Sequence, residues 1–293
     1  MNIHANHVFA GTESPLDWEP QLETYQTRSG ALSGKFQAIV GKGKVLGQAT
    51  RTYEIFGNAH LKALAGEIAR VGNLQVAGFG EFHEGARVWA QLVRNSEVEG
   101  YGRNIVLLSG HNGTDSLKIV DTLAHYVCWN LAPNAQWSLK HTRNIHARAK
   151  QIVDAIAEAS GTFHELEQDV RNFRTKPMSS DEFCAFAFTV VRKAEGENRE
   201  QLLRNAATSL EEASENIKTR TDNAIAELHA LWSGDGLVGD YGEDRERAWN
   251  AFTQWIDHKQ ADTDVRRSRA ALSSVEGTGA DTKRRARNIL RRW

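Results

Sequence analysis

Apolar and polar residues alternate through four successive stretches near the middle of the chain, and residues that favour turns separate them. The stretches are Leu74–Phe82, Arg87–Arg94, Asn104–Gly110 and Ser116–Val127. A period of two is typical of strands in a sheet, and short connectors join neighbouring strands in antiparallel order. The pattern therefore predicts an antiparallel meander. In the fourth stretch the apolar positions also fit a helix, so both readings remain open there.

Two further elements are predicted before this meander. Short β-like runs at Phe36–Val40 and Val45–Ala49 flank Gly41–Lys44, a glycine-containing connector of a length that suits a hairpin. The connector lacks the spacing of a phosphate-binding loop. Apolar residues at helical spacing predict a helix over Ala59–Val71, whereas residues 1–20 are polar and aperiodic and predict an irregular segment.

From Arg143 onward the apolar residues recur every three or four positions, which is the period of amphipathic helices. One stripe covers residues 145–173, with a break or bend expected at Ser160–Thr162. Ser179 and Glu182 have the spacing of a capping box and predict the start of another helix. Further helices are expected over residues 197–232, over residues 243–258 and at the C-terminal end.

These patterns predict an α+β protein. We expect an irregular segment over residues 1–20 and, over residues 21–142, a domain with an antiparallel meander sheet and one or two helices. A mostly helical domain with a basic end is expected over residues 143–293.

Composition narrows the class of protein. The chain has 293 residues, of which 40% are hydrophobic and 25% charged, and its formal net charge is -1. Attraction to nucleic acid must therefore come from local patches. The two cysteines, Cys128 and Cys184, predict no disulfide framework and favour a reducing cytosol. Because we find neither a leader-like segment nor an apolar run of about 18 residues, we expect a cytoplasmic protein with no membrane partner.

Six groups of residues occur along the chain in a distinctive order. They are Gly85–Trp89, Ser109–Gly113, Val127–Leu131, Lys140–Thr142, Trp249–His258 and Gly277–Lys283. In this order they resemble the motifs of a phage- and plasmid-borne family, the domain of unknown function 932, over Tyr53–Leu290. The resemblance implies an origin in a mobile genetic element rather than a mechanism. The family usually has Asp-Gly where Asn112-Gly113 stands and Glu-Tyr where Gln254-Trp255 stands. The two changes remove carboxylates, which lowers the expectation of a metal-dependent activity.

Several residues have side chains that bind metals or act as nucleophiles. The potential metal ligands are His111, Cys128, His141, Asp257 and His258. None of them has a familiar ligand spacing, and no protease-like or hydrolase-like signature surrounds Cys128 and its potential bases, His125 and His141. We therefore predict no catalytic residue, cofactor or metal, and keep a metal-dependent nuclease or hydrolase as an alternative.

Basic residues interleaved with aromatic ones are the strongest functional signal. Residues 140–150 read KHTRNIHARAK, with four cations and no acid, and six more cations lie between Lys283 and Arg292. Cations at the start of a helix oppose the preference of its dipole, which indicates that an anion such as phosphate uses the charge. Four aromatic residues could stack on bases. They are Trp89, Tyr101, Trp129 and Trp137.

The sequence thus predicts a non-enzymatic protein of a phage or plasmid that binds single-stranded DNA or another nucleic acid, with annealing or recombination as its setting. The expected contact residues are Arg87, Trp89, Lys140, His141, Arg143, Arg148, Lys150, Lys283, Arg284 and Arg285. A homo-oligomer is expected as well. The main alternative is a module that binds a host protein, supported by the acid-rich runs Glu195–Glu200 and Glu211–Glu215.

Overall fold

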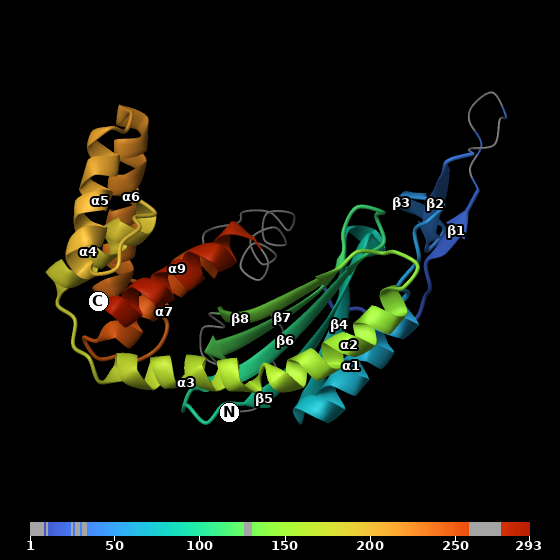
Figure 1. Cartoon of the computed structure of the whole chain (residues 1–293), viewed down its shortest axis with the longest axis horizontal. Helices are drawn as coiled ribbons and strands as arrows, with labels where there is room; N and C mark the ends of the chain where they lie inside the picture. Colours follow the sequence, from blue (N-terminus) through green and yellow to red (C-terminus); the bar gives the residue numbers. More distant parts are fainter. Residues whose placement is uncertain are drawn as a thin grey trace. The chain divides into compact units, whose positions relative to one another are not determined.

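The chain forms two β-sheets in its N-terminal half and a series of helices in its C-terminal half (Figure 1). The computed structural model describes residues 9, 11–24, 26, 30, 34–125, 131–257 and 277–293. This arrangement confirms the predicted α+β class. Among the described residues, every helix is too short or too polar to cross a membrane.

The smaller sheet contains three antiparallel strands, β1 (Gln21–Glu23), β2 (Phe36–Gly41) and β3 (Lys44–Thr50). The predicted hairpin is β2–β3. Lys42 and Gly43 at its tip have φ values of 54° and 72°, as a two-residue hairpin turn requires. Strand β1 was not predicted, because three residues are too few to establish a period.

The larger sheet has five strands in chain order. They are β4 (Gln75–Phe82), β5 (Arg87–Asn95), β6 (Tyr101–Gly110), β7 (Leu117–His125) and β8 (Leu131–Leu139). Strands β4, β5 and β6 pair antiparallel, and a single turn of 3-10 helix, η2 (His83–Gly85), joins the first two. The ambiguous fourth stretch is strand β7. Strand β8 was missed, since it contains Pro133, a residue that sheets accept at an edge.

The chain folds into two compact units, each formed from several segments of the sequence. The sheet unit comprises Met1–Ser96, Gly102–Thr122 and Asn134–Phe163, and the helical unit comprises Glu97–Tyr101, Leu123–Pro133 and His164–Trp293. Helix α2 (Ile145–Glu158) therefore belongs to the sheet unit, although its residues follow position 142, where the sequence places the start of the helical domain.

Two helices cover one face of the larger sheet in the sheet unit, α1 (Asn58–Gly72) and α2 (Figure 1). Alternate residues of the strands face these helices, among them Val88 and Leu92 of β5 and Ile105 of β6, all fully buried. Leu61 and Ile152 belong to the same core from the helix side. The helices bury an apolar stripe, as their period of about 3.6 residues predicts.

The two sheets meet at a close approach of backbones. A Cβ atom on Gly113, whose φ is 80°, would lie 1.9 Å from the carbonyl oxygen of Gln48 on β3. A Cβ atom on Gly47 would lie 2.2 Å from the carbonyl oxygen of Asn112. No real Cβ atom tolerates such distances, so both positions require glycine.

A buried ion pair joins strands β6 and β7. Arg103 donates to both carboxylate oxygens of Asp121 at 2.9 and 2.8 Å, and Asn134 of β8 donates to the same carboxylate at 3.0 Å. The guanidinium also lies over the Phe163 ring at 5.0 Å. A buried ion pair tolerates loss of either partner poorly, because the remaining charge stays buried without compensation.

The described part of the helical unit contains most of helix α3 (Ser160–Arg174) and five further helices. They are α4 (Ser180–Val191), α5 (Arg199–Glu211), α6 (Glu215–Trp232), α7 (Arg245–Asp257) and α9 (Thr278–Arg292). Aromatic side chains form its core: Phe183 stacks on Trp232 at 4.7 Å, and Phe186 meets Phe252 edge-on at 5.2 Å.

A group of polar side chains is buried in the helical unit around His125. Its ring lies 4.7 Å from the ring of Tyr101 and 5.5 Å from that of Tyr241. Glu246 accepts hydrogen bonds from Tyr101 and Arg174. Burial, together with the positive charge of Arg174, lowers the pKa of His125 from 6.5 to about 4.

The predicted capping box is present at the start of α4, where Ser179 Oγ accepts from the backbone N–H of Glu182 and the Glu182 carboxylate accepts from that of Ser179. We expect Ser179→Ala to lower the free energy of unfolding by about 1 kcal/mol in urea denaturation, because it leaves a helix N–H group without its partner. Ser214, at the start of α6, makes no such side-chain bond and supplies the matched control. An equal loss in Ser214→Ala would contradict this account.

The buried state of His125 predicts a pH dependence of stability. An unfolded histidine has a pKa near 6.5, so between pH 6.5 and about 4 the unfolded chain binds more protons than the folded one. The free energy of unfolding should therefore fall as pH falls through this window, with up to about 3 kcal/mol arising from His125. His125→Phe should show a correspondingly smaller fall in urea denaturation. Parallel curves for the two proteins would refute this assignment.

Candidate nucleic-acid interface

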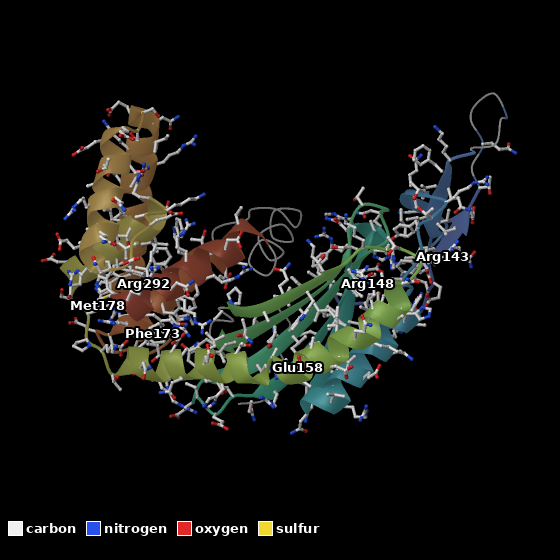
Figure 2. The ribbon with its side chains drawn as sticks, viewed as in Figure 1. Arg143, Arg148, Glu158, Phe173, Met178 and Arg292 are labelled. Carbon is white, nitrogen blue, oxygen red and sulfur yellow. The ribbon has the colours of Figure 1, made fainter. Side chains whose placement is uncertain are left out.

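The basic segment Lys140–Lys150 begins after strand β8 and continues into the first turns of α2. Lys140, Arg143 and Lys150 are exposed and Arg148 is half-buried. Figure 2 labels Arg143 and Arg148 near the N-terminal end of α2. Within the described ranges the side chains of these four cations make no hydrogen bond or ion pair. No carboxylate of the described residues therefore compensates their charge by direct contact.

The packing of α2 determines which residues of this segment face outward. Ile145, Ala149 and Ile152 are buried in the core of the sheet unit. Because a helix has 3.6 residues per turn, Lys150 lies well away from that stripe and Arg148 lies at its edge, which agrees with the half-buried state of Arg148. The apolar period thus places the cations at the surface.

The N-terminus of α2 adds to the positive potential. The cap residue Asn144 makes no side-chain hydrogen bond to the helix, and the first turn contains no acid. The positive end of the helix dipole and its free N–H groups are therefore uncompensated from within the helix, and both attract anions.

A fifth exposed cation precedes a residue that pairs with this segment. Tyr53 and Thr142 form an isolated antiparallel bridge, and the backbone N–H of Glu54 donates to the carbonyl of His141. The exposed Arg51 lies two residues before this bridge in the chain. We call Arg51, Lys140, Arg143, Arg148 and Lys150 together the basic edge. Sequence reasoning missed Arg51, since its place depends on a pairing between distant parts of the chain.

Imidazole rings lie among these cations. His146 of α2 stands 4.2 Å from His60 of α1, ring centroid to ring centroid, and stacks on Phe56 at 5.3 Å. His60 is exposed and His146 is half-buried. Glu54 is the acid that approaches this pair, at 3.4 Å from His146 Nε2.

Arg87 lies elsewhere in the sheet unit and has a carboxylate partner. It donates to Asp115 from two nitrogens, at 3.0 and 2.5 Å. Burial alone would raise the pKa of Asp115, but hydrogen bonds and the charge of Arg87 outweigh it, and the pKa is lowered. Arg87 therefore holds the turn that contains Asn112 and Asp115, and its charge is largely neutralised.

The expected stacking surfaces are corrected by burial. Trp89 is 0% exposed and Tyr101 2% exposed, so neither presents a ring face to a base. The Trp89 indole donates to Thr12 Oγ1 at 3.0 Å. Trp137 is half-buried against the core, and Trp129 lies outside the described residues.

The C-terminal cations belong to α9 in the helical unit. Lys283 is 0% exposed and bonds to Asp257, so the expectation that it contacts nucleic acid is corrected. Arg284 pairs with Asp281 at 3.3 Å. Arg284, Arg285 and Arg292 line a hollow of about 340 Å³ to which Glu195 and Asp281 also contribute. With acids among its lining residues, this hollow is a weaker anion site than the basic edge.

His141 is only 6% exposed, which excludes it from the basic edge as a phosphate contact. Its ring stacks on Tyr53 with centroids 4.9 Å apart. His111 is 1% exposed, and burial with the nearby His141 lowers its pKa to about 3. Burial also lowers the pKa of His141, opposed by the hydrogen bond to the Glu54 backbone. At neutral pH both rings are therefore uncharged.

The potential metal ligands are divided between the two units. His111 and His141 are neighbours in the sheet unit, whereas Asp257 belongs to the helical unit and is bonded to Lys283. Cys128 and His258 lie outside the described residues. In the part of the chain that the structure describes, one group of three potential metal ligands has its donor atoms within 4.8 Å of one another, namely Glu97, His164 and Glu167.

In comparisons with known proteins, the chain matches one family model and no individual protein. A family model described as Domain of unknown function (DUF932) matches residues 45–275. The matched range includes the basic edge and both buried histidines, and it ends before α9. No curated protein and no solved structure matches the chain.

Proposed function

The chain belongs to the DUF932 family, whose description names no activity, and we propose from its charge distribution that it binds single-stranded nucleic acid through the basic edge. The observation that carries this proposal is the set of cations at the start of α2 that have no carboxylate partner among the residues that the structure describes. Unpaired cations at a helix N-terminus favour an anionic partner, and phosphate is the anion that a nucleic-acid backbone repeats.

The dimensions of the basic edge suit a single backbone. From Arg143 to Lys150 a helical path covers about 10 Å, at 1.5 Å per residue. This length accommodates two or three phosphates of one strand. Lys140 lies before the helix start, and Arg51 is two residues from the bridge between Tyr53 and Thr142.

His60 and His146 take the place of the tryptophans as stacking groups. Their rings lie beside the cations, and His60 is exposed. Histidine is among the side chains on which unpaired bases stack. A base can reach these rings only when it is not paired within a duplex, which favours single strands.

The biological setting of the proposal rests on fewer observations. An origin in a phage or plasmid is supported by the six ordered motifs, and a role in annealing or recombination would suit a protein that holds single strands without chemistry. Binding in the cytosol fits a chain with only two cysteines. Assembly into a homo-oligomer would lengthen the short track that one basic edge provides.

The charge part of this proposal is tested with a labelled single-stranded oligonucleotide and fluorescence anisotropy over a range of salt concentrations. Combined replacement of Lys140, Arg143, Arg148 and Lys150 by Gln should weaken binding and flatten its salt dependence. The slope of log K against log salt should fall by about 0.7 for each lost phosphate contact.

Arg70→Gln and Arg220→Gln are the matched controls, since both side chains are exposed cations outside the basic edge. They should bind as the wild type does. The proposal fails if the wild type shows no affinity at low salt, or if the fourfold variant binds as tightly as the controls.

The stacking part predicts a separate effect. His60→Ala combined with His146→Ala should weaken binding to single strands by about 1–3 kcal/mol, the usual contribution of one stacked base, and should change binding to duplex much less. His164→Ala, which removes an exposed imidazole of the helical unit, is the control. Equal losses on single strands and duplex would rule out stacking while leaving the charge result intact.

A further inference from the structure

Two family-like motifs meet at a pair of buried histidines that nucleic-acid binding does not use. His111 follows strand β6, and its Nε2 lies 2.9 Å from Oδ1 of Asn58. The amide of Asn58 is oriented by its Nδ2, which donates to the carbonyl of Trp18 at 2.7 Å. Oδ1 is therefore an acceptor, and His111 must donate from Nε2. Its Nδ1 then carries a lone pair.

His141 is held in the complementary way. Its Nδ1 lies 3.2 Å from the backbone carbonyl oxygen of Glu54, which can only accept. The proton is therefore on Nδ1, and the lone pair is on Nε2. His111 Nδ1 and His141 Nε2 are both buried, and neither has a hydrogen-bond partner in the described chain.

Tyr53 links the two histidines in space. Its ring stacks on that of His141, nearly parallel at 8°. Its hydroxyl donates at 3.0 Å to the carbonyl of Gly110, the residue directly before His111. Tyr53 thus connects the segment after β6, which contains His111, with the segment after β8, which contains His141. Each of these histidines has one ring nitrogen without a hydrogen-bond partner among the described residues.

A buried acceptor without a donor is rare in folded proteins and calls for an explanation. Two such nitrogens on neighbouring neutral imidazoles match the chemistry of a metal site. In such sites the second ring N–H of each histidine donates to a carbonyl or carboxylate oxygen, which fixes the tautomer. Neutral imidazole is a preferred ligand of Zn²⁺, Cu²⁺ and Ni²⁺.

We propose that His111 Nδ1 and His141 Nε2 together bind a divalent transition-metal ion of the Zn²⁺ class. The two imidazole nitrogens are the ligands from the protein, and water molecules complete the coordination. The ion connects the turn after β6 with the segment that enters α2. Because Lys140 precedes His141 directly, the ion also orders the start of the basic edge.

The triad of Glu97, His164 and Glu167 in the helical unit is the competing ligand set. Its side chains at Glu97 and His164 are largely exposed, and Glu97 already pairs with Arg171 at 3.2 Å. Two of its three ligands are carboxylates, which also suit harder cations. The test must therefore separate the two sets.

The experiment uses the full chain, stripped with a chelator and titrated with Zn²⁺ by calorimetry and with Co²⁺ by visible absorption. We expect a single high-affinity ion per chain. His111→Gln and His141→Gln should each weaken binding by at least about 100-fold, since changes to the groups around a ligand alone cost about 10–100-fold. Zn²⁺ should raise the melting temperature of the wild type and not that of either variant.

His60→Gln, His146→Gln and His164→Gln are the controls and should keep the ion. Absence of stoichiometric binding overturns the proposal, as does retention in both His111→Gln and His141→Gln, or loss in His164→Gln. If the two variants do not fold, side-chain ¹H–¹⁵N spectra of the wild type decide the matter. Two imidazole rings should respond to Zn²⁺, one through Nδ1 and one through Nε2, and any other response contradicts the site. Oligonucleotide binding is measured separately, so failure of either proposal leaves the other standing.

Discussion

The burial of α2 against α1 and the larger sheet is the constraint on which the surface chemistry of the sheet unit depends. Ile145, Ile152 and Ile156 are buried there, and each contributes about 1.5–3 kcal/mol by leaving water. A helix fixed by such a stripe has no freedom to rotate. The positions of the cations on the same helix are therefore fixed by apolar packing, with Lys150 away from the buried stripe and Arg148 at its edge.

Local patterns were enough to predict most elements of the fold. The period-two stretches became β4–β7, and the spacing of Ser179 and Glu182 located the start of α4, because both signals depend on neighbours in sequence. Strand β8 was missed, since Pro133 interrupts its pattern. The membership of α2 in the sheet unit depends on what the helix packs against, and no sequence period records its partner.

The residues of the candidate site also divide into those that local sequence predicts and those that depend on tertiary contacts. Lys140, Arg143 and Lys150 were predictable as surface cations, since residues 140–150 contain no acid. Arg87 and Lys283 looked equivalent, yet Asp115 and Asp257 neutralise them through contacts that only the fold creates. Arg51 was missed because the bridge between Tyr53 and Thr142 joins distant parts of the chain, and the contact between His60 and His146 likewise exists only in the fold. Charge runs thus indicate where cations are, and tertiary partners decide which of them stay available.

The facing glycines between the two sheets have a consequence for how sequence change in this protein is interpreted. Gly47 and Gly113 contribute no side-chain atom to any site, yet a single added carbon at either would force the backbones of β3 and the His111–Asp115 turn apart. Both positions therefore tolerate no replacement, and a mutational scan would rank them with residues that do chemistry. Intolerance of substitution at these two glycines reflects the lack of space for a Cβ atom. Both positions should therefore be excluded before substitution-intolerant positions are used to locate a functional surface.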